Sequence, residues 1–237
     1  MKILKIRRGF TEIKILFELA VKNNCIICGG YARYCASPQS IKNIIPAKDV
    51  DLFPRTEESC ANLLKDLRQL GFKIKYENKI SYTMEPKKKN VDSLNHIPTP
   101  QIIKPVKEGH IVSVGTMEEI LNNFDFTVVR AGIISETEVM VDDDFEVDEF
   151  NKKLQLKNIH CPISSTLRCI KYSKKGYFLG PMEALKLFQD WDRRGDEYKK
   201  NMIELFGKSK KGKKSEDNPA GMTAEDIDEL ESLLRID

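Results

Sequence analysis

Two short motifs near the start of the chain are suited to chemistry on phosphate groups. The pair Gly29-Gly30 follows a short apolar run, Cys25–Cys28, and Asp49 and Asp51 open a second run that alternates polar with apolar residues. Alternation places both carboxylates on one face of a strand, roughly 7 Å apart at their base, because each residue advances about 3.3 Å. Carboxylates at this spacing can converge on one Mg²⁺ ion or bridge two.

The glycine pair meets a second requirement, a backbone that phosphate can approach closely. At the end of a strand and the start of a helix near Tyr31, it offers free amides and a helix N-terminus. A D-x-D on a strand is also typical of a solvated face, and Gly-Gly is also typical of a turn. The order of buried strand, glycine pair, helix and D-x-D strand is more specific. With Val50 and Leu52 turned into the core, that order indicates metal-assisted chemistry on a phosphate.

The composition limits the class of protein. A chain of 237 residues can form one domain with a helical appendage, and its net charge of +3 is too small to indicate nucleic-acid binding. The six cysteines stand mostly in apolar or helical contexts, which fits a reducing compartment. No apolar run approaches membrane-spanning length. We therefore expect a cytoplasmic protein without a membrane partner.

The elements that position the two motifs are predicted from hydrophobic periodicity. They form an α+β fold, a mixed sheet flanked by helices and followed by a small helical region and a tail. The acidic stretch 142–149 is expected to be a solvated turn. Helices are predicted over residues 12–22, from Tyr31, and over 57–70, 116–123, 163–173 and 181–206, and strands over 25–28, 49–53, 72–76, 79–84, 101–106 and 125–134.

The residues CIICGGYARY, from Cys25, followed by KDVDLF at 48–53, resemble the core signature of the DNA polymerase β-like nucleotidyltransferase superfamily. GGYAR is also similar to the start of tRNA CCA-adding enzymes and of abortive-infection-type nucleotidyltransferase toxins. FDFT at 124–127 and RCIKYSKKGY at 168–177 resemble uncharacterised nucleotidyltransferase-like proteins of bacteriophages and large DNA viruses. The similarity covers roughly residues 20–180, and a viral origin would place the protein in the host cytoplasm.

The resemblance implies roles for particular residues. Gly29 and Gly30 would bind the incoming triphosphate, while Asp49 and Asp51 would bind Mg²⁺ or Mn²⁺. The strand over 101–106 carries no acid where the superfamily places its third carboxylate, so we substitute Asp125, which also fits a turn residue or a helix-terminus partner. Eighteen residues separate Gly30 from Asp49, which implies an inserted loop beside the site.

Further contacts to the nucleotide are expected from basic and aromatic side chains. Each also fits a solvated surface or an ordinary cationic helix end. Helical spacing brings Arg168 and Lys171 to the same side. The candidates are Arg33, Lys48, Arg168, Lys171, Tyr172 and Lys175.

The chain is predicted to have four parts. They are a nucleotidyltransferase-like palm (1–158), a helical region packed on the palm (159–206), a flexible basic linker (207–222) and an acidic amphipathic helix (223–237). The last part has Ile227, Leu230, Leu233 and Leu234 along one side. Such a helix is either a docking peptide for a protein partner or a frayed tail.

Two functions follow from these predictions. The first is a metal-dependent nucleotidyltransferase that transfers a nucleoside monophosphate from an NTP to an acceptor hydroxyl, on RNA such as a tRNA end or on a protein. A toxin-like enzyme that modifies host tRNA belongs to the same class. The second is an inactive nucleotidyltransferase-fold binding or assembly module of viral origin, which docks a partner through its C-terminal helix.

Overall fold

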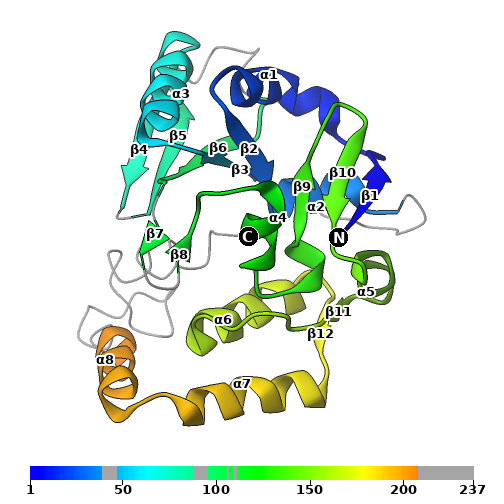
Figure 1. Ribbon diagram of the computed structural model, residues 1–237, viewed down its shortest axis with the longest axis vertical. Helices are drawn as coiled ribbons and strands as arrows, with labels where there is room; N and C mark the ends of the chain where they lie inside the picture. The colour runs from blue at the N-terminus through cyan, green and yellow to red at the C-terminus, as the bar shows by residue number, and fades with distance from the viewer. Residues whose placement is uncertain (39–46, 79, 88–95, 106, 109–110, 208–237) are drawn as a thin grey trace, which may run out of the picture.

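The computed structural model describes residues 1–38, 47–78, 80–87, 96–105, 107–108 and 111–207. A mixed sheet of eight strands forms the centre of the molecule (Figure 1). Its strands are β1 (Lys2–Lys5), β2 (Cys25–Cys28), β3 (Asp49–Pro54), β4 (Phe72–Glu77), β5 (Ser81–Pro86), β6 (Thr99–Ile103), β9 (Ala131–Ile133) and β10 (Glu138–Val141).

The strands follow the order β1-β10-β9-β2-β3-β6-β5-β4. Only β3 and β6 pair in parallel, and the other neighbours in this sheet are antiparallel. Helices cover both faces, so the predicted α+β fold is confirmed. They are α1 (Lys14–Lys22), α2 (Gly30–Ala36), α3 (Glu57–Gln69), α4 (Met117–Asn122), α5 (Phe145–Asn151), α6 (Pro162–Ser173), α7 (Pro181–Arg193) and α8 (Asp196–Gly207).

Smaller elements complete the described chain. Two 3₁₀ turns, η1 (Phe10–Ile13) and η2 (Thr127–Val129), precede α1 and β9, respectively. Two short strand pairs lie outside the main sheet. They are the antiparallel pair β7 (Lys107–Glu108) and β8 (Ile111–Val112), and the parallel pair β11 (Lys153–Leu154) and β12 (Phe178–Leu179).

The sheet separates two apolar layers. Helices α1, α2 and α3 pack on one face, while α4, α6 and α7 contribute to the layer on the other. Strand β3 contributes to both layers because its side chains alternate. Val50 and Leu52 are buried in the first layer and Phe53 in the second. Asp49 and Asp51 therefore share the face of Phe53, on the side of α4 and α6.

Local sequence accounts well for several elements. The Thr56 side chain accepts a hydrogen bond from the Ser59 amide and caps α3, and Gly71, with φ of 100°, follows its end. Thr116 and Glu119 form a capping box at the start of α4. These two predicted helices, and the strands at β2 and β3, are confirmed.

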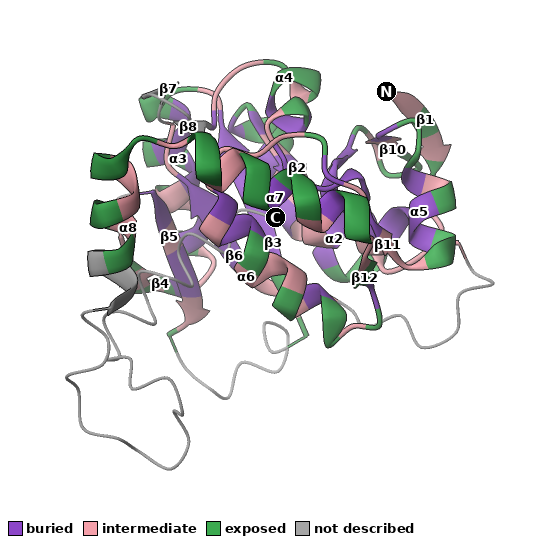
Figure 2. Cartoon of the chain, turned by 90° about the horizontal axis from the view of Figure 1, so that it is seen from below, coloured by how far each residue is buried: buried purple, intermediate pink, exposed green. Residues whose placement is uncertain are grey.

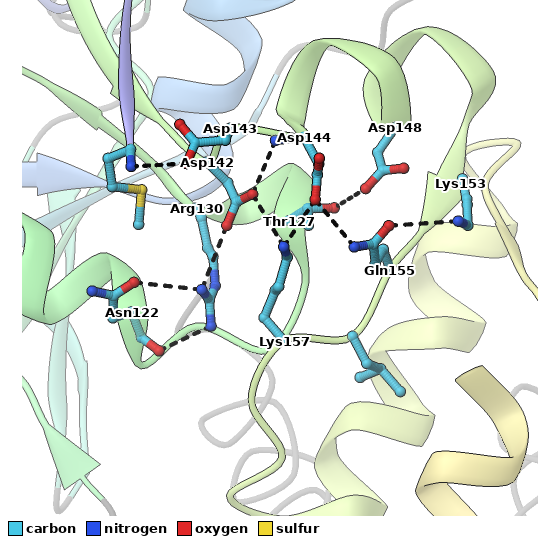
Figure 3. A network of polar contacts seen from close by, with 12 residues as sticks. Asn122, Thr127, Arg130, Asp142, Asp143, Asp144, Asp148, Lys153, Gln155 and Lys157 are labelled. Atoms are coloured by element: carbon cyan, nitrogen blue, oxygen red, sulfur yellow. Dashed lines mark hydrogen bonds and ion pairs between the residues drawn. The ribbon is translucent and has the colours of Figure 1, made fainter. Parts of the chain in front are cut away.

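The strand predicted over 125–134 is wrong in its first half. Asp125 lies in a bend, the 3₁₀ turn η2 follows, and only the end of the stretch forms β9. The buried guanidinium of Arg130 explains this path, since it donates to the carbonyl oxygens of Phe124 and Asn122, each at 2.9 Å. It also pairs with Asp142 at 3.5 Å (Figure 3). These contacts fold the chain back on itself, which an extended strand would not allow.

The acidic stretch 142–149 is not the solvated turn that its composition predicts. It leads from β10 into α5, where Asp148 and Glu149 are buried. Cations distant in sequence neutralise the exposed part, and Lys157 Nζ lies 2.9 Å from Asp144 (Figure 3). Thr127 donates a hydrogen bond of 2.6 Å to Asp148. Contacts with residues outside the stretch therefore stabilise its helical and partly buried conformation.

Two further elements of the fold differ from the prediction. Strand β1 was not predicted, and the helix expected over 181–206 is broken between α7 and α8, where Arg194 is extended with ψ of 140°.

No described helix is both long and apolar enough to cross a bilayer. The division at residue 158 stays a prediction, and residues 208–237, with nearly all of the basic linker and the whole acidic helix, lie outside the described residues.

Candidate nucleotide and metal site

The strand register brings the two motifs together. Cys28, the last residue of β2, pairs with Asp51 of β3, and the glycine pair follows Cys28 directly. At Gly30, an added Cβ would meet only the Cβ of Ala47, at 4.0 Å. The open side of this glycine therefore faces the segment that enters β3 at Asp49. The site is formed where β2 ends, α2 begins and β3 starts.

Gly29 has a backbone that side-chain-bearing residues rarely adopt, with φ of 84° and ψ of −142°. Its amide donates to the Ala131 carbonyl at 2.8 Å, and its carbonyl accepts from the Arg33 amide at 2.9 Å. The expectation that both glycine amides are free is therefore wrong for Gly29, which acts through its conformation. The backbone amides of Gly30 and Tyr31 lie in the first turn of α2 and point toward its N-terminal end.

The two aspartates differ in burial. Asp49 is exposed at the start of β3, whereas Asp51 is only 3% exposed. Burial, and then the charge of Asp51, raise the pKa of the Cys28 thiol far above its ordinary range, which places that charge beside Cys28. Two carboxylates on one strand face, one reachable from solvent, suit Mg²⁺, which is bound through one or two carboxylates with substrate phosphates and water.

The neighbouring strand offers no third carboxylate beside this pair. Gln101 of β6 stands opposite Asp51 in the parallel register, and its amide nitrogen lies 3.4 Å from the Ser81 hydroxyl. Among the residues that the structure describes, no three His, Cys, Asp or Glu side chains are arranged to hold a metal. A metal ion at this place would therefore have Asp49 and Asp51 as its carboxylate ligands among the described residues, and a triphosphate would have to supply further oxygen ligands.

Asp125 is held by two side chains of α6. It is buried, and its Oδ2 accepts hydrogen bonds from Ser165 at 2.9 Å and from Arg168 at 2.8 Å. Burial, and then the charge of Asp125, raise the pKa of the Cys169 thiol to about 12. The structure thus joins two candidate site residues, Asp125 and Arg168, in an ion pair that fixes α6 to the loop after α4. The role of Asp125 as the third carboxylate stays a prediction.

Two of the predicted nucleotide contacts lie in the core. Arg33 is 2% exposed, and its Nη1 donates to Glu149 at 3.2 Å and to Tyr177 at 2.7 Å. Tyr172 is fully buried, with its ring 6.4 Å from Phe126 and 5.3 Å from Tyr177, centroid to centroid. Neither side chain is presented to a nucleotide, so both predictions are corrected: these residues hold the fold together.

The predicted lysines lie nearer the surface. Lys48 is exposed directly before Asp49, and Lys171 and Lys175 are partly exposed on and just after α6. Lys175 Nζ lies 4.7 Å from the centroid of the Tyr172 ring. Of these, only Lys48 adjoins the motif residues in sequence, and all three roles stay predictions.

A buried polar cluster behind the glycine pair was not predicted. Glu149, fully buried in α5, accepts hydrogen bonds from the side chains of Arg33, Ser37, Lys152 and Tyr177. It joins α2, which begins at the glycine pair, to α5 and to the segment after α6. The spacing of Phe145 and Glu149, one turn apart, is the one sequence signal that places Glu149 on a buried face.

We predict that Gly29→Ala destabilises the protein by about 1–3 kcal/mol, because the new side chain is forced into a backbone region that it disfavours. Gly180→Ala is the matched control, since Gly180 has φ of −69° and an added Cβ meets nothing within 4 Å. Urea unfolding of the two variants provides the measurement. Equal free energies of unfolding for both would contradict a conformational role for Gly29.

The fold defines a class of protein. Similar solved structures include a tRNA-processing enzyme in an apo form (TM-score 0.54, 15% identity, 80% of this chain and 49% of that one). A CCA-adding enzyme in complex with CTP gives a TM-score of 0.54 at 16% identity, over 81% and 47% of the two chains. A tRNA nucleotidyltransferase with primer tRNA and an incoming ATP analogue gives 0.50 at 14% identity, over 80% and 51%. At these identities the likeness shows the fold alone, that of the nucleotidyltransferases.

The family model is more specific. The chain belongs to the Gabija anti-defense 2 family, whose model matches residues 4–153, the part that contains nearly all of the sheet, the glycine pair and both aspartates. No curated protein matches the sequence. The chain spans about half the length of the solved nucleotidyltransferases that it resembles.

Proposed function

We propose that this protein is a metal-dependent nucleotidyltransferase, which transfers a nucleoside monophosphate from an NTP to an acceptor hydroxyl and releases pyrophosphate. The observation that carries the proposal is the pairing of Cys28 with Asp51. This register sets the glycine pair and the D-x-D pair at one place on a nucleotidyltransferase fold. Each motif alone is common, but their juxtaposition on this sheet supports a triphosphate site.

Each of the site residues has its own role in the proposed reaction. Asp49 and Asp51 would hold Mg²⁺ or Mn²⁺, which would offset the charge of the triphosphate and favour loss of the proton from the attacking hydroxyl. Gly30, with open space at its Cα, lets the phosphates approach the backbone. Lys48, exposed beside Asp49, adds a positive charge at the entrance. The buried position of Asp51 strengthens its electrostatic interactions, because the surrounding dielectric constant is low.

The proposed acceptor is RNA, such as the end of a tRNA. The support is the resemblance to solved enzymes that were captured with CTP, or with tRNA and an ATP analogue. A protein hydroxyl would use the same metal site. The family description supports a role in counteracting Gabija defense. We therefore propose that nucleotide transfer by this protein counteracts that defense.

Incubation with each of the four α-labelled NTPs tests the proposal, using total RNA and total protein as separate acceptors in Mg²⁺ or Mn²⁺. We expect label in one acceptor pool, and a chelator should abolish it. Label in RNA and label in protein would each identify the acceptor class. If the folded protein transferred no label to either pool, the proposed nucleotidyltransferase activity would be contradicted.

The second candidate is an inactive module that keeps the fold to bind or assemble with a partner. The observation that favours it is the neutral Gln101 opposite Asp51, together with the engagement of Asp125 by Arg168. This candidate predicts that nucleotide is irrelevant and that deletion of residues 223–237 abolishes partner capture. Unchanged capture by the truncated chain would count against it.

A further inference from the structure

An apolar groove runs between α6 and α7, on the outer side of the helical layer. It has a volume of about 230 Å³, and its lining includes Ile163, Ala184, Phe188 and the side chain of Trp191. Phe188 is 71% exposed. Figure 2 shows α7 crossing the view with many exposed residues along it. The groove is therefore open along the helix that forms its outer wall.

The apolar surface continues beyond the groove. Ile170 of α6, one turn after the groove-lining Thr166, is 52% exposed, and Leu185 of α7, next to the groove-lining Ala184, is 45% exposed. Large apolar side chains gathered on two neighbouring helices differ from the single exposed residues that most proteins carry. Such a surface is typical of a site that receives an amphipathic helix.

We propose that this groove binds residues 223–235 of the same chain. That segment, which lies outside the described residues, is predicted from its sequence to be amphipathic, with Ile227, Leu230, Leu233 and Leu234 on one side. In the groove, these side chains would meet Phe188 and Trp191. Its other side is acidic, through Glu225, Asp228 and Glu229.

The charge of the groove wall is complementary to that segment. Helix α6 contains no Asp or Glu, and it carries Lys171, with Lys174 and Lys175 just after its end. Arg168 does not add to this charge, because it pairs with the buried Asp125 at 2.8 Å. Lys174 is exposed and Lys171 and Lys175 are partly exposed. On the other wall, Asp190 and Asp192 of α7 pair with Arg194 at 2.7 Å and with Lys199 at 3.8 Å. An acidic helix laid along α6 would therefore place its carboxylates near the lysines of that helix. This favours the acidic segment over a basic or neutral occupant.

The length of the connecting chain permits the contact. The rings of Trp191 and Tyr198 are 6.3 Å apart, so α8 starts beside the groove. Its 12 residues extend about 18 Å from there to Gly207. Fifteen residues, 208–222, separate Gly207 from Thr223. A flexible chain of that length would have a root-mean-square span of about 22 Å. The effective concentration of the segment at the groove is then on the order of millimolar.

Acrylamide quenching of Trp191 fluorescence in the full chain tests the proposal, because the sequence contains a single Trp. In Leu230→Asp/Leu234→Asp, loss of the docked segment should raise the quenching constant about twofold and shift the emission to the red, since docking at millimolar effective concentration is lost. Ser232→Asp is the matched control, because helical geometry places Ser232 opposite the apolar side. It should quench like the wild type.

A second variant separates docking from a local effect on the fluorophore. Phe188→Asp, at an exposed position, should retain the fold and raise the quenching constant in a similar way. Adding Leu230→Asp/Leu234→Asp to it should then have no further effect. Equal quenching in the wild type and the Leu230/Leu234 variant would overturn the proposal. Protection of Trp191 from acrylamide that disappears on dilution would also overturn the proposal. In that case the segment in the groove would come from a second copy of the chain.

Discussion

Asp51→Asn should lower the rate of nucleotidyl transfer about a thousandfold while the protein remains folded. The asparagine keeps the shape of the side chain but removes the negative charge that holds the divalent cation. A cation of this kind contributes several kcal/mol to stabilising the charged transition state, and each 1.4 kcal/mol is a factor of ten in rate. Initial rates of label transfer at saturating Mg²⁺ provide the measurement.

The control for this variant is an aspartate away from the site. Asp143 has a side chain that is 72% exposed and pairs with the N-terminal amine, so Asp143→Asn should keep the wild-type rate. Circular dichroism and urea unfolding verify that both variants fold. If folded Asp51→Asn retained the wild-type rate, the assignment of the metal to β3 would be wrong, even for a protein that transfers nucleotides.

Glu149→Ala should cost about 3–5 kcal/mol of stability, because removal of one partner from a buried ion pair leaves the other charge uncompensated. The uncompensated group is Arg33, which lies on α2 a few residues after the glycine pair. Partial displacement of α2 would also weaken nucleotide binding. The free energy of unfolding in urea is the quantity to compare.

Glu146 provides the matched control in the same helix. It pairs with Lys2 and Arg7, but its side chain is 35% exposed, so Glu146→Ala should cost only about 0–1 kcal/mol. Similar losses in the two variants would mean that the buried cluster adds nothing beyond an ordinary surface pair. In that case α2 must be held by its apolar contacts alone.

The sequence was sufficient for the elements whose signals are local. The apolar run of β2, the alternation in β3 and the Thr116 capping box each depend on residues within a few positions, and the structure confirms these elements. The glycine pair and the D-x-D pair were predicted to form one site from their order. The register of Cys28 with Asp51 supplies the geometry that order alone lacks.

The errors arose where distant partners decide the structure. Arg33 reads as a surface cation near a phosphate motif, yet its partner Glu149 lies 116 positions away. Asp125 reads as a strand carboxylate, yet Arg168 and Ser165 of α6 engage it. No local pattern encodes these pairings. Buried charges are satisfied by whichever groups the tertiary fold brings to them.

Binding of Mn²⁺, followed by electron paramagnetic resonance with each of the four NTPs, addresses the metal site without requiring an acceptor. We predict nucleotide-dependent Mn²⁺ binding by the wild-type protein, and affinity at least about tenfold weaker in Asp49→Asn/Asp51→Asn, because the charge of the ligands sets cation affinity. Equal Mn²⁺ binding by the wild type and the folded double variant would contradict a metal site at Asp49 and Asp51, and so would the absence of binding to the wild type with all four nucleotides.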